Sequence, residues 1–264
     1  MVMLYFSGTG NSKYIAELFN RYMNGKSNSS KGCSIKCCSI EENLDFAQLI
    51  SLEEVIGFCY PIYGSRVPRI MREFTEKHIG FLKNKKIIIF CTQLIFSGDG
   101  ARAFTDLFPK NYIEVMYAEH FLMPNNVCNF FLLSLANEKK IKKYITRAEQ
   151  KMQIVCSNIK NGIIKKRGFN NISRMLGLVQ GTFMPKIEKK ASDSVIINED
   201  CTKCRLCVSI CPMHNLEYKN EKIMHNHNCT LCYRCINQCP EKAITIFFHE
   251  IVKNQYKGLF TKEF

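Results

Sequence analysis

Several features that would indicate a membrane or secreted protein are missing from this chain of 264 residues. No run of about 18 consecutive apolar residues occurs, and the best candidate, residues 121–136, is interrupted by Pro124. The opening residues lack the basic segment and the long apolar run of a secretory signal peptide. We therefore expect a soluble, cytoplasmic protein without membrane insertion.

Acidic side chains are also scarce, with 23 Asp and Glu against 37 Lys and Arg and a net charge of +14. The excess is +2 in residues 1–130, +8 in residues 131–200 and +4 in residues 201–264. An overall excess of this kind suggests an acidic partner. Because most of it lies in one middle segment, nucleic acid is disfavoured. A solvated basic face and a docking surface for an acidic protein both remain open.

Apolar runs typical of buried strands alternate with helical spacing through the first half of the chain. Near-continuous apolar strands separated by helices predict a parallel sheet that is covered on both faces. The fold class is therefore α/β, with a doubly wound, five-stranded parallel sheet. The expected strands cover residues 2–6, 33–40, 54–60, 86–91 and 112–118, and the expected helices cover residues 12–23, 67–78, 101–108 and 138–161.

The domain organisation follows from a change in composition after this region. Residues 186–194 are polar and indicate a linker, and a cysteine-rich segment begins at Cys201. We expect a first domain over residues 1–162 and a connector of undetermined structure over residues 163–195. A small α+β domain with a C-terminal tail then covers residues 196–264.

The cysteine-rich segment contains one internal repeat. Cys201-Thr-Lys-Cys-Arg-Leu-Cys-Val-Ser-Ile-Cys-Pro recurs, starting at Cys229, as Cys-Thr-Leu-Cys-Tyr-Arg-Cys-Ile-Asn-Gln-Cys-Pro. The spacing C-x2-C-x2-C-x3-C-P is that of two interlocked [4Fe-4S] clusters, in which the fourth cysteine of each run binds the other cluster. Zinc is disfavoured because zinc motifs pair C-x2-C with a distant second pair. The predicted ligands are Cys201, Cys204, Cys207 and Cys239 for one cluster, and Cys211, Cys229, Cys232 and Cys235 for the other.

A glycine-containing loop joins the first expected strand to the first expected helix. Its hydroxyls, its close-approaching backbone and the positive end of the helix form a phosphate cradle. The dinucleotide fingerprint fails because Lys13 stands where the third glycine belongs, and no Walker lysine follows. The loop therefore fits a terminal monophosphate, which is the group that FMN carries. The predicted phosphate residues are Ser7, Gly8, Thr9, Gly10, Asn11 and Ser12.

Two further loops follow the third and fourth expected strands. Ligands of open α/β sheets bind beyond the carboxyl ends of the strands, where the strand order reverses. These loops contain turn residues, backbone amides and an aromatic side chain that could contact a flat ring. The predicted ring contacts are Pro61, Ile62, Tyr63, Gly64, Thr92, Gln93, Gly98 and Asp99.

These motifs together resemble a fused flavodoxin–ferredoxin protein of the kind found in anaerobes. The resemblance implies FMN, two [4Fe-4S] clusters and the strand order 2-1-3-4-5, and it places Met123-Pro124-Asn125-Asn126 beside the flavin. It predicts electron transfer between clusters and flavin, with an acidic ferredoxin or reductase as partner. No paired carboxylates or nucleophile–base pair indicate a catalytic residue. A ferredoxin-dependent flavin reductase acting on a quinone or nitro compound, or a redox-sensing module, remains an alternative.

Overall fold

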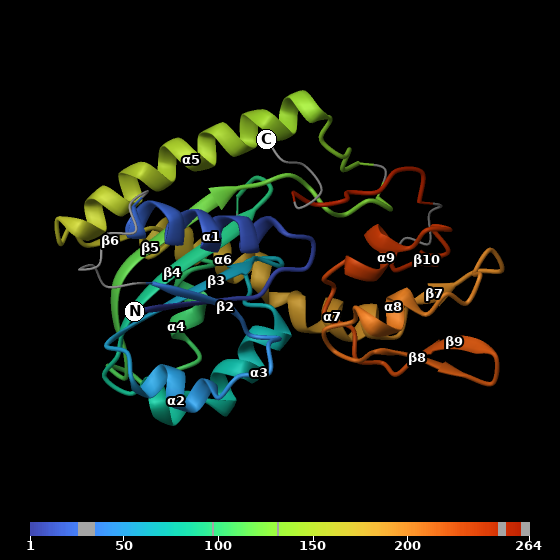
Figure 1. Ribbon diagram of the computed structural model, residues 1–264, viewed down its shortest axis with the longest axis horizontal. Helices are drawn as coiled ribbons and strands as arrows, with labels where there is room; N and C mark the ends of the chain where they lie inside the picture. The colour runs from blue at the N-terminus through green and yellow to red at the C-terminus, as the bar shows by residue number, and fades with distance from the viewer. Residues whose placement is uncertain (26–34, 97, 131, 248–251, 260–264) are drawn as a thin grey trace.

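The computed structural model describes residues 1–25, 35–96, 98–130, 132–247 and 252–259. Its centre is a parallel sheet with the strand order β2-β1-β3-β4-β5-β6, which confirms the predicted doubly wound sheet (Figure 1). The strands are β1 (Val2–Tyr5), β2 (Lys36–Ser39), β3 (Val55–Pro61), β4 (Lys86–Gln93), β5 (Glu114–Leu122) and β6 (Lys165–Lys166).

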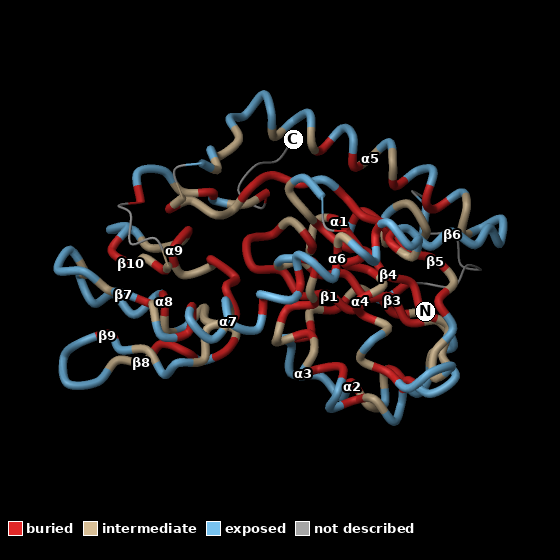
Figure 2. Tube along the Cα trace, turned by 180° about the vertical axis from the view of Figure 1, so that it is seen from behind, coloured by how far each residue is buried: buried red, intermediate tan, exposed pale blue. Residues whose placement is uncertain are grey.

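Helices cover both faces of the sheet, so its central strands are buried on both sides (Figure 2). Helices α1 (Asn11–Asn24) and α5 (Glu138–Lys160) pack on one face, where Phe19 and Met152 belong to the same apolar cluster. The opposite face is covered by α2 (Phe46–Ser51), α3 (Arg69–Lys77), the 3-10 turn η1 (Ile79–Leu82) and α4 (Arg102–Thr105).

The structure corrects several of the predicted boundaries. Among the described residues the sheet has six strands instead of five, because the two-residue β6 pairs with Tyr117 and Ala118 of β5. The expected helix 101–108 is reduced to α4, and the strand expected over 112–118 extends to Leu122. Cys33, expected in the second strand, lies outside the described residues.

A buried carboxylate ties the sixth strand to the sheet. Glu119 of β5 is 1% exposed and lies 3.0 Å from both Lys151 of α5 and Lys165 of β6, and Arg167 is 3.5 Å away. Burial raises the pKa of Glu119, but Lys151, Lys165 and the His120 N–H outweigh it and lower the pKa below its ordinary value. Part of the basic middle segment therefore neutralises an internal charge, while Lys165 and Arg167 stay about half exposed.

The connector predicted for residues 163–195 is mostly helical. It contains β6, α6 (Asn171–Thr182) and α7 (Met184–Ser192), and α7 leads from the sheet domain to the cysteine-rich domain (Figure 1). That domain consists of β7 (Ile196–Ile197), α8 (Leu206–Ser209), β8 (Leu216–Lys219), β9 (Lys222–His225), α9 (Arg234–Gln238) and β10 (Ile244–Thr245). Strands β7 and β10 pair antiparallel, as do β8 and β9. Within the described residues, no helix has the length and apolar character needed to cross a membrane.

Candidate functional site

The glycine loop lies between β1 and α1, as its sequence predicts. Gly10 adopts φ +97°, a left-handed conformation that suits glycine, and its N–H donates to the Ser7 hydroxyl oxygen at 3.0 Å. The hydroxyls of Ser12 and Thr92 are 2.7 Å apart and buried, so they join the loop to the end of β4. The loop is therefore fixed at the N-terminus of a 14-residue helix, where an anion is stabilised.

A cavity of about 660 Å³ opens beside this loop, within the size range of small-molecule sites. Residues from all three predicted loops line it, at one edge of the sheet. The predicted residues that line it are Ser7, Gly8, Thr9, Asn11, Ser12, Pro61, Ile62, Tyr63, Thr92 and Gln93, together with Met123, Pro124, Asn125 and Asn126. Gly10 and Gly64 belong to the same loops without lining the cavity.

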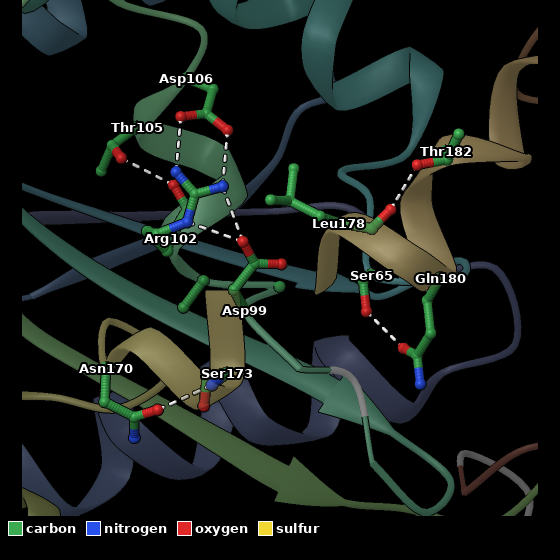
Figure 3. Close-up of polar contacts among 12 residues, drawn as sticks. Ser65, Asp99, Arg102, Thr105, Asp106, Asn170, Ser173, Leu178, Gln180 and Thr182 are labelled. Atoms are coloured by element: carbon green, nitrogen blue, oxygen red, sulfur yellow. Dashed lines mark hydrogen bonds and ion pairs between the residues drawn. The ribbon is translucent and has the colours of Figure 1, made fainter. Parts of the chain in front are cut away.

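Two predicted ring contacts lie elsewhere. Gly98 and Asp99 do not line the cavity but pack under α6. Asp99 is fully buried, and one of its carboxylate oxygens accepts from Arg102 at 2.6 Å (Figure 3). A Cβ atom added to Gly177 of α6 would lie 1.6 Å from the other oxygen. Helix α6 therefore covers Gly98 and Asp99, where the loop motif predicts contacts to a flavin ring.

The cavity also has walls that the loop motifs do not predict. Met184, Ile187 and Lys190 of α7 line it, and so do Leu231, Tyr233 and Phe247 of the cysteine-rich domain. Phe130 and Leu133, from the segment before α5, complete the apolar part. Leu231 and Tyr233 lie inside the cysteine repeat, but no motif marks any of these residues as part of the cavity, because only the tertiary packing of the two domains brings them to the loop.

The lining of the cavity fits a flat ring with an anionic tail. Hydroxyls and helix N–H groups surround one end, whereas aromatic and aliphatic side chains form the rest. The Tyr63 hydroxyl is buried and has no hydrogen-bond partner among the described residues. A buried polar atom of this kind ordinarily has a partner, so a ligand with polar ring atoms suits this wall.

The eight cysteines of the repeat gather into the two predicted sets. Cys201, Cys204, Cys207 and Cys239 surround one small cavity, and Cys211, Cys229, Cys232 and Cys235 surround another. Within the described parts of the chain, no group of three or more His, Cys, Asp or Glu side chains is arranged to hold a single metal ion. Thiols spread around a cavity fit a polynuclear cluster, whose iron atoms lie apart.

The sequence repeat is reproduced in the backbone. Lys203 and Arg205 of the first half have φ near +60°, and so do Leu231 and Tyr233 at the equivalent positions of the second. Non-glycine residues adopt this conformation at a cost, so its recurrence indicates a constraint from the site.

In both halves of the repeat, a backbone N–H group donates a hydrogen bond to a cysteine sulfur. The N–H groups of Asn215 and Ala243 donate to the sulfurs of Cys211 and Cys239, at 3.2 and 3.3 Å. Hydrogen bonds to cluster sulfurs are one means by which a protein tunes cluster potential.

The second cysteine set lies against the glycine loop. Leu231 and Tyr233 line both its cavity and the large cavity, so they form the wall between the two. A Cβ atom on Gly8 would lie 2.4 Å from the Cys232 carbonyl oxygen, a distance that no side chain tolerates. Gly8 therefore allows the two domains to meet closely here.

Arg234 connects the same surfaces through hydrogen bonds. Its guanidinium donates to the carbonyl oxygens of Ser7 and Gly8 at 2.8 and 3.1 Å, and to that of Ile210 at 3.0 Å. Two 2.7 Å contacts to Glu41 form a bidentate ion pair, and this pair raises the pKa of Arg234 although burial opposes the charge. One side chain thus links the glycine loop, the residue before Cys211 and the end of β2.

The C-terminal segment adds a second connection. The Tyr256 hydroxyl donates to the Asn11 side-chain oxygen at 2.6 Å, and the Asn11 amide donates to the Pro124 carbonyl at 2.9 Å. Asn237 of α9 accepts from the Tyr256 N–H and donates to the Asn126 carbonyl. The chain therefore returns to the glycine loop after the second cysteine set.

Comparison with protein families finds matches to two regions of the chain. Residues 2–131 match the model of the Flavodoxin domain, and residues 200–244 match the model of the 4Fe-4S dicluster domain. The first match ends before α5, and the second contains all eight cysteines of the repeat. A comparison with curated proteins finds no match.

Similar solved structures include flavodoxins. A reduced flavodoxin from Megasphaera elsdenii is 20% identical, with 46% of this chain and 85% of that one covered and a TM-score of 0.39. A flavodoxin from the domain Archaea is 13% identical, with 60% and 97% covered and a TM-score of 0.41. A structure described as a flavone reductase is 11% identical, with 89% and 86% covered and a TM-score of 0.41.

Proposed function

Since this chain is a fusion of a flavodoxin-like domain with a ferredoxin-type 4Fe-4S domain, we propose that it passes single electrons between two [4Fe-4S] clusters and one FMN. Flavodoxin and 4Fe-4S domains make it an electron-transfer protein of the flavin and iron–sulfur type. We propose residues 1–162 as the flavin-binding unit and residues 196–264 as the cluster-binding unit. The bound groups supply the redox chemistry, and the protein supplies their positions and surroundings.

The observation that carries the proposal is the wall shared by two cavities. Leu231 and Tyr233 separate the cavity of the second cysteine set from the cavity beside the glycine loop. We assign the nearer cluster to Cys211, Cys229, Cys232 and Cys235, and the farther one to Cys201, Cys204, Cys207 and Cys239. On this assignment the nearer cluster mediates exchange between the farther cluster and the flavin.

In the flavin site we assign the phosphate to the loop from Ser7 to Ser12. The hydroxyl of Thr9 and the N–H groups at the start of α1 hold its charge, and Ser12 braces the loop through Thr92. Tyr63 and Tyr233 offer aromatic surfaces to the ring from opposite domains. The apolar walls exclude water from the ring.

Cofactor analysis of anaerobically purified protein tests this assignment. We expect about eight iron and eight sulfide per chain and one FMN. Cys232→Ser is expected to remove the nearer cluster and about half of the iron, whereas Cys37→Ser, outside both sets, leaves the iron unchanged. Stoichiometric zinc without sulfide, or FAD in place of FMN, would refute the assignment.

A second candidate is reduction of a small acceptor at the flavin. The part of the cavity formed by Leu133, Ile187 and Phe247 is apolar, and Lys190 adds a positive charge to its lining. An aromatic acceptor such as a quinone suits this environment. Steady-state turnover that Ile187→Asp slows, with flavin content unchanged, supports this activity; absence of turnover with quinones and nitro compounds excludes it.

We further propose that an acidic redox protein docks on the basic face of α5. Lys139, Lys140, Lys142, Lys143 and Arg147 are exposed there, whereas Lys151 is bound to Glu119. Charge complementarity of this kind accelerates encounter and weakens as salt is added.

Stopped-flow reduction by an acidic ferredoxin at low salt tests this docking. Reversing Lys139, Lys142 and Lys143 to Glu is expected to slow the reaction, whereas reversing Lys83, Lys219 and Lys222, which are exposed elsewhere, leaves it unchanged. Equal rates for wild type and the first variant would show that the α5 lysines are only solvated.

A further inference from the structure

Helix α6 presents its small residues to the protein and its large apolar residues to solvent. Its buried positions are Ser173, Gly177 and Gly181, spaced by four residues along one face. A Cβ atom on Gly181 would lie 2.2 Å from the Arg66 guanidinium carbon, and one on Gly177 would overlap Asp99. These contacts fix which face of the helix is inward.

Polar contacts hold the helix in the same orientation. Asn170 caps its N-terminus by accepting from the Ser173 N–H at 2.7 Å (Figure 3). Near its other end, the Ser65 hydroxyl of the loop after β3 donates to the Gln180 side-chain oxygen (Figure 3). The helix is therefore attached to the ends of β3 and β4, and it cannot turn its other face inward without losing these contacts.

The outward face carries a stripe of large apolar side chains. Ile172, Met175, Val179 and Phe183 are 70, 61, 63 and 60% exposed, and their spacing places them on one side. Leu178, 49% exposed, flanks the stripe. A surface helix ordinarily turns such a face toward the core, and contiguous exposed apolar surface marks an interaction site.

Positive charge adjoins the stripe on α7. Met184 and Ala191 are buried on its inner face, and Glu188 bonds to Arg72 of α3 at 2.7 Å. Helical geometry places Lys186 and Lys189 on the outer side, and both are exposed together with Lys190. An apolar stripe is thus followed directly by a cationic one.

The chemistry of these two stripes indicates which kind of partner binds this face. A second copy would bring like charges together in a chain of net charge +14. Transient redox interfaces are small and largely polar, which does not suit a row of large aliphatic side chains. Exposed apolar side chains beside lysines on surface helices are the combination that binds an anionic lipid surface.

We propose that the outer faces of α6 and α7 dock the protein on an anionic membrane surface. The apolar stripe enters the boundary between headgroups and acyl chains, and Lys186 and Lys189 contact the lipid phosphates. At 12 residues α6 is too short to span a bilayer, so the helix lies on the membrane. Docking brings the α7 side of the cavity close to the lipid.

Vesicle co-sedimentation of the full-length protein with its cofactors tests the proposal. We expect binding to vesicles of phosphatidylcholine with one third phosphatidylglycerol, and little binding to phosphatidylcholine alone. Neutralising Lys186 and Lys189 to Gln is expected to weaken binding about 25-fold, since each cation near the surface contributes about fivefold. The matched control is Lys139 and Lys142 to Gln on α5, which removes the same charge and leaves binding within about twofold.

A second pair of variants tests whether the apolar stripe contributes to vesicle binding. Met175→Gln with Val179→Gln is expected to weaken binding more than about tenfold, whereas Leu52→Gln with Ile154→Gln, at exposed apolar positions elsewhere, leaves it unchanged. Unchanged visible spectra show that all variants retain their cofactors.

Three results would overturn the proposal. One is a wild-type protein that stays in the supernatant with anionic vesicles at low salt. Another is equal loss of binding in the α5 control, which would show that only net charge matters. The third is a wild-type dimer that Met175→Gln with Val179→Gln dissociates, without vesicle binding, which would make the face an interface between copies.

Discussion

The guanidinium of Arg234 donates to the Gly8 carbonyl oxygen at 3.1 Å, so a residue between two predicted cluster ligands directly supports the predicted phosphate loop. The same side chain bonds to Ser7 and Ile210 and is oriented by Glu41. Arg234 is thus a positioning residue, which shapes both sites through backbone carbonyls.

Replacing Arg234 by Gln is expected to lower FMN affinity about 10- to 100-fold. Each hydrogen bond from a charged group contributes about 1.5–3 kcal/mol, and the loop loses two of them, at the Ser7 and Gly8 carbonyls. Because the loop keeps its other contacts, we expect only part of this loss, about 1.4–2.8 kcal/mol, to appear as weaker FMN binding. Flavin titration of the flavin-free protein measures the change. Arg205→Gln is the matched control, because Arg205 stacks on Tyr218 away from the loop; equal affinity in both variants would contradict this role.

Thr9→Ala is expected to weaken FMN binding about tenfold or more. Thr9 is 7% exposed and lines the cavity, so its hydroxyl is available to a phosphate oxygen. Fluorescence titration with FMN and with riboflavin separates the two parts of the ligand: the loss should appear with FMN and vanish with riboflavin. Thr146→Ala on exposed α5 is the control, and an equal loss with riboflavin would place the phosphate elsewhere.

Gly8→Ala is expected to separate the two domains at their closest point. The added methyl would lie 2.4 Å from the Cys232 carbonyl, so the backbone there must move. We expect slower flavin reduction by dithionite-reduced clusters in single-turnover stopped flow, with iron content unchanged. Gly80→Ala adds a methyl to open space and serves as the control. An unaltered rate in Gly8→Ala would show that this contact does not position the sites.

His120 makes stability depend on pH. Burial lowers its pKa from 6.5 to about 4, and its ring accepts from the Ala101 N–H at 3.3 Å. Below pH 6.5 the unfolded chain takes up a proton that the folded one does not, so stability falls by up to about 1.4 kcal/mol per pH unit between pH 6.5 and 4.

Urea denaturation followed by circular dichroism at pH 6.5 and 5.5 measures this dependence. Wild type is expected to lose more stability over the interval than His120→Gln, which cannot take up the proton. Parallel losses in the two proteins would show that His120 does not titrate as its burial requires.

Local spacing predicted most of the fold and the core of the site. The apolar pattern of a strand and the spacing of the cysteine repeat each extend over only a few consecutive residues. The sheet and the grouping of the cysteines can therefore be predicted from the sequence. β6 was missed because two lysines carry no strand pattern: they pair with Tyr117 and Ala118 of β5, and Lys165 also forms an ion pair with Glu119. Gly98 and Asp99 were assigned to the flavin because nothing in the sequence shows that α6 covers them.

The contacts between domains could not be predicted in the same way. Arg234 and Tyr256 lie far along the chain from the residues they bind in the glycine loop. Their roles depend on how the two domains pack against each other, and contacts between domains produce no periodic pattern in the sequence.

Counting electrons per chain tests the central claim most directly. Anaerobic reductive titration, followed by optical and electron spin resonance spectra, is expected to take up about four electrons, two by FMN and one by each cluster. Cys232→Ser is expected to take up about three and to reduce the flavin more slowly from the remaining cluster. Uptake of two electrons by flavin alone, with no iron–sulfur signal, would contradict the account.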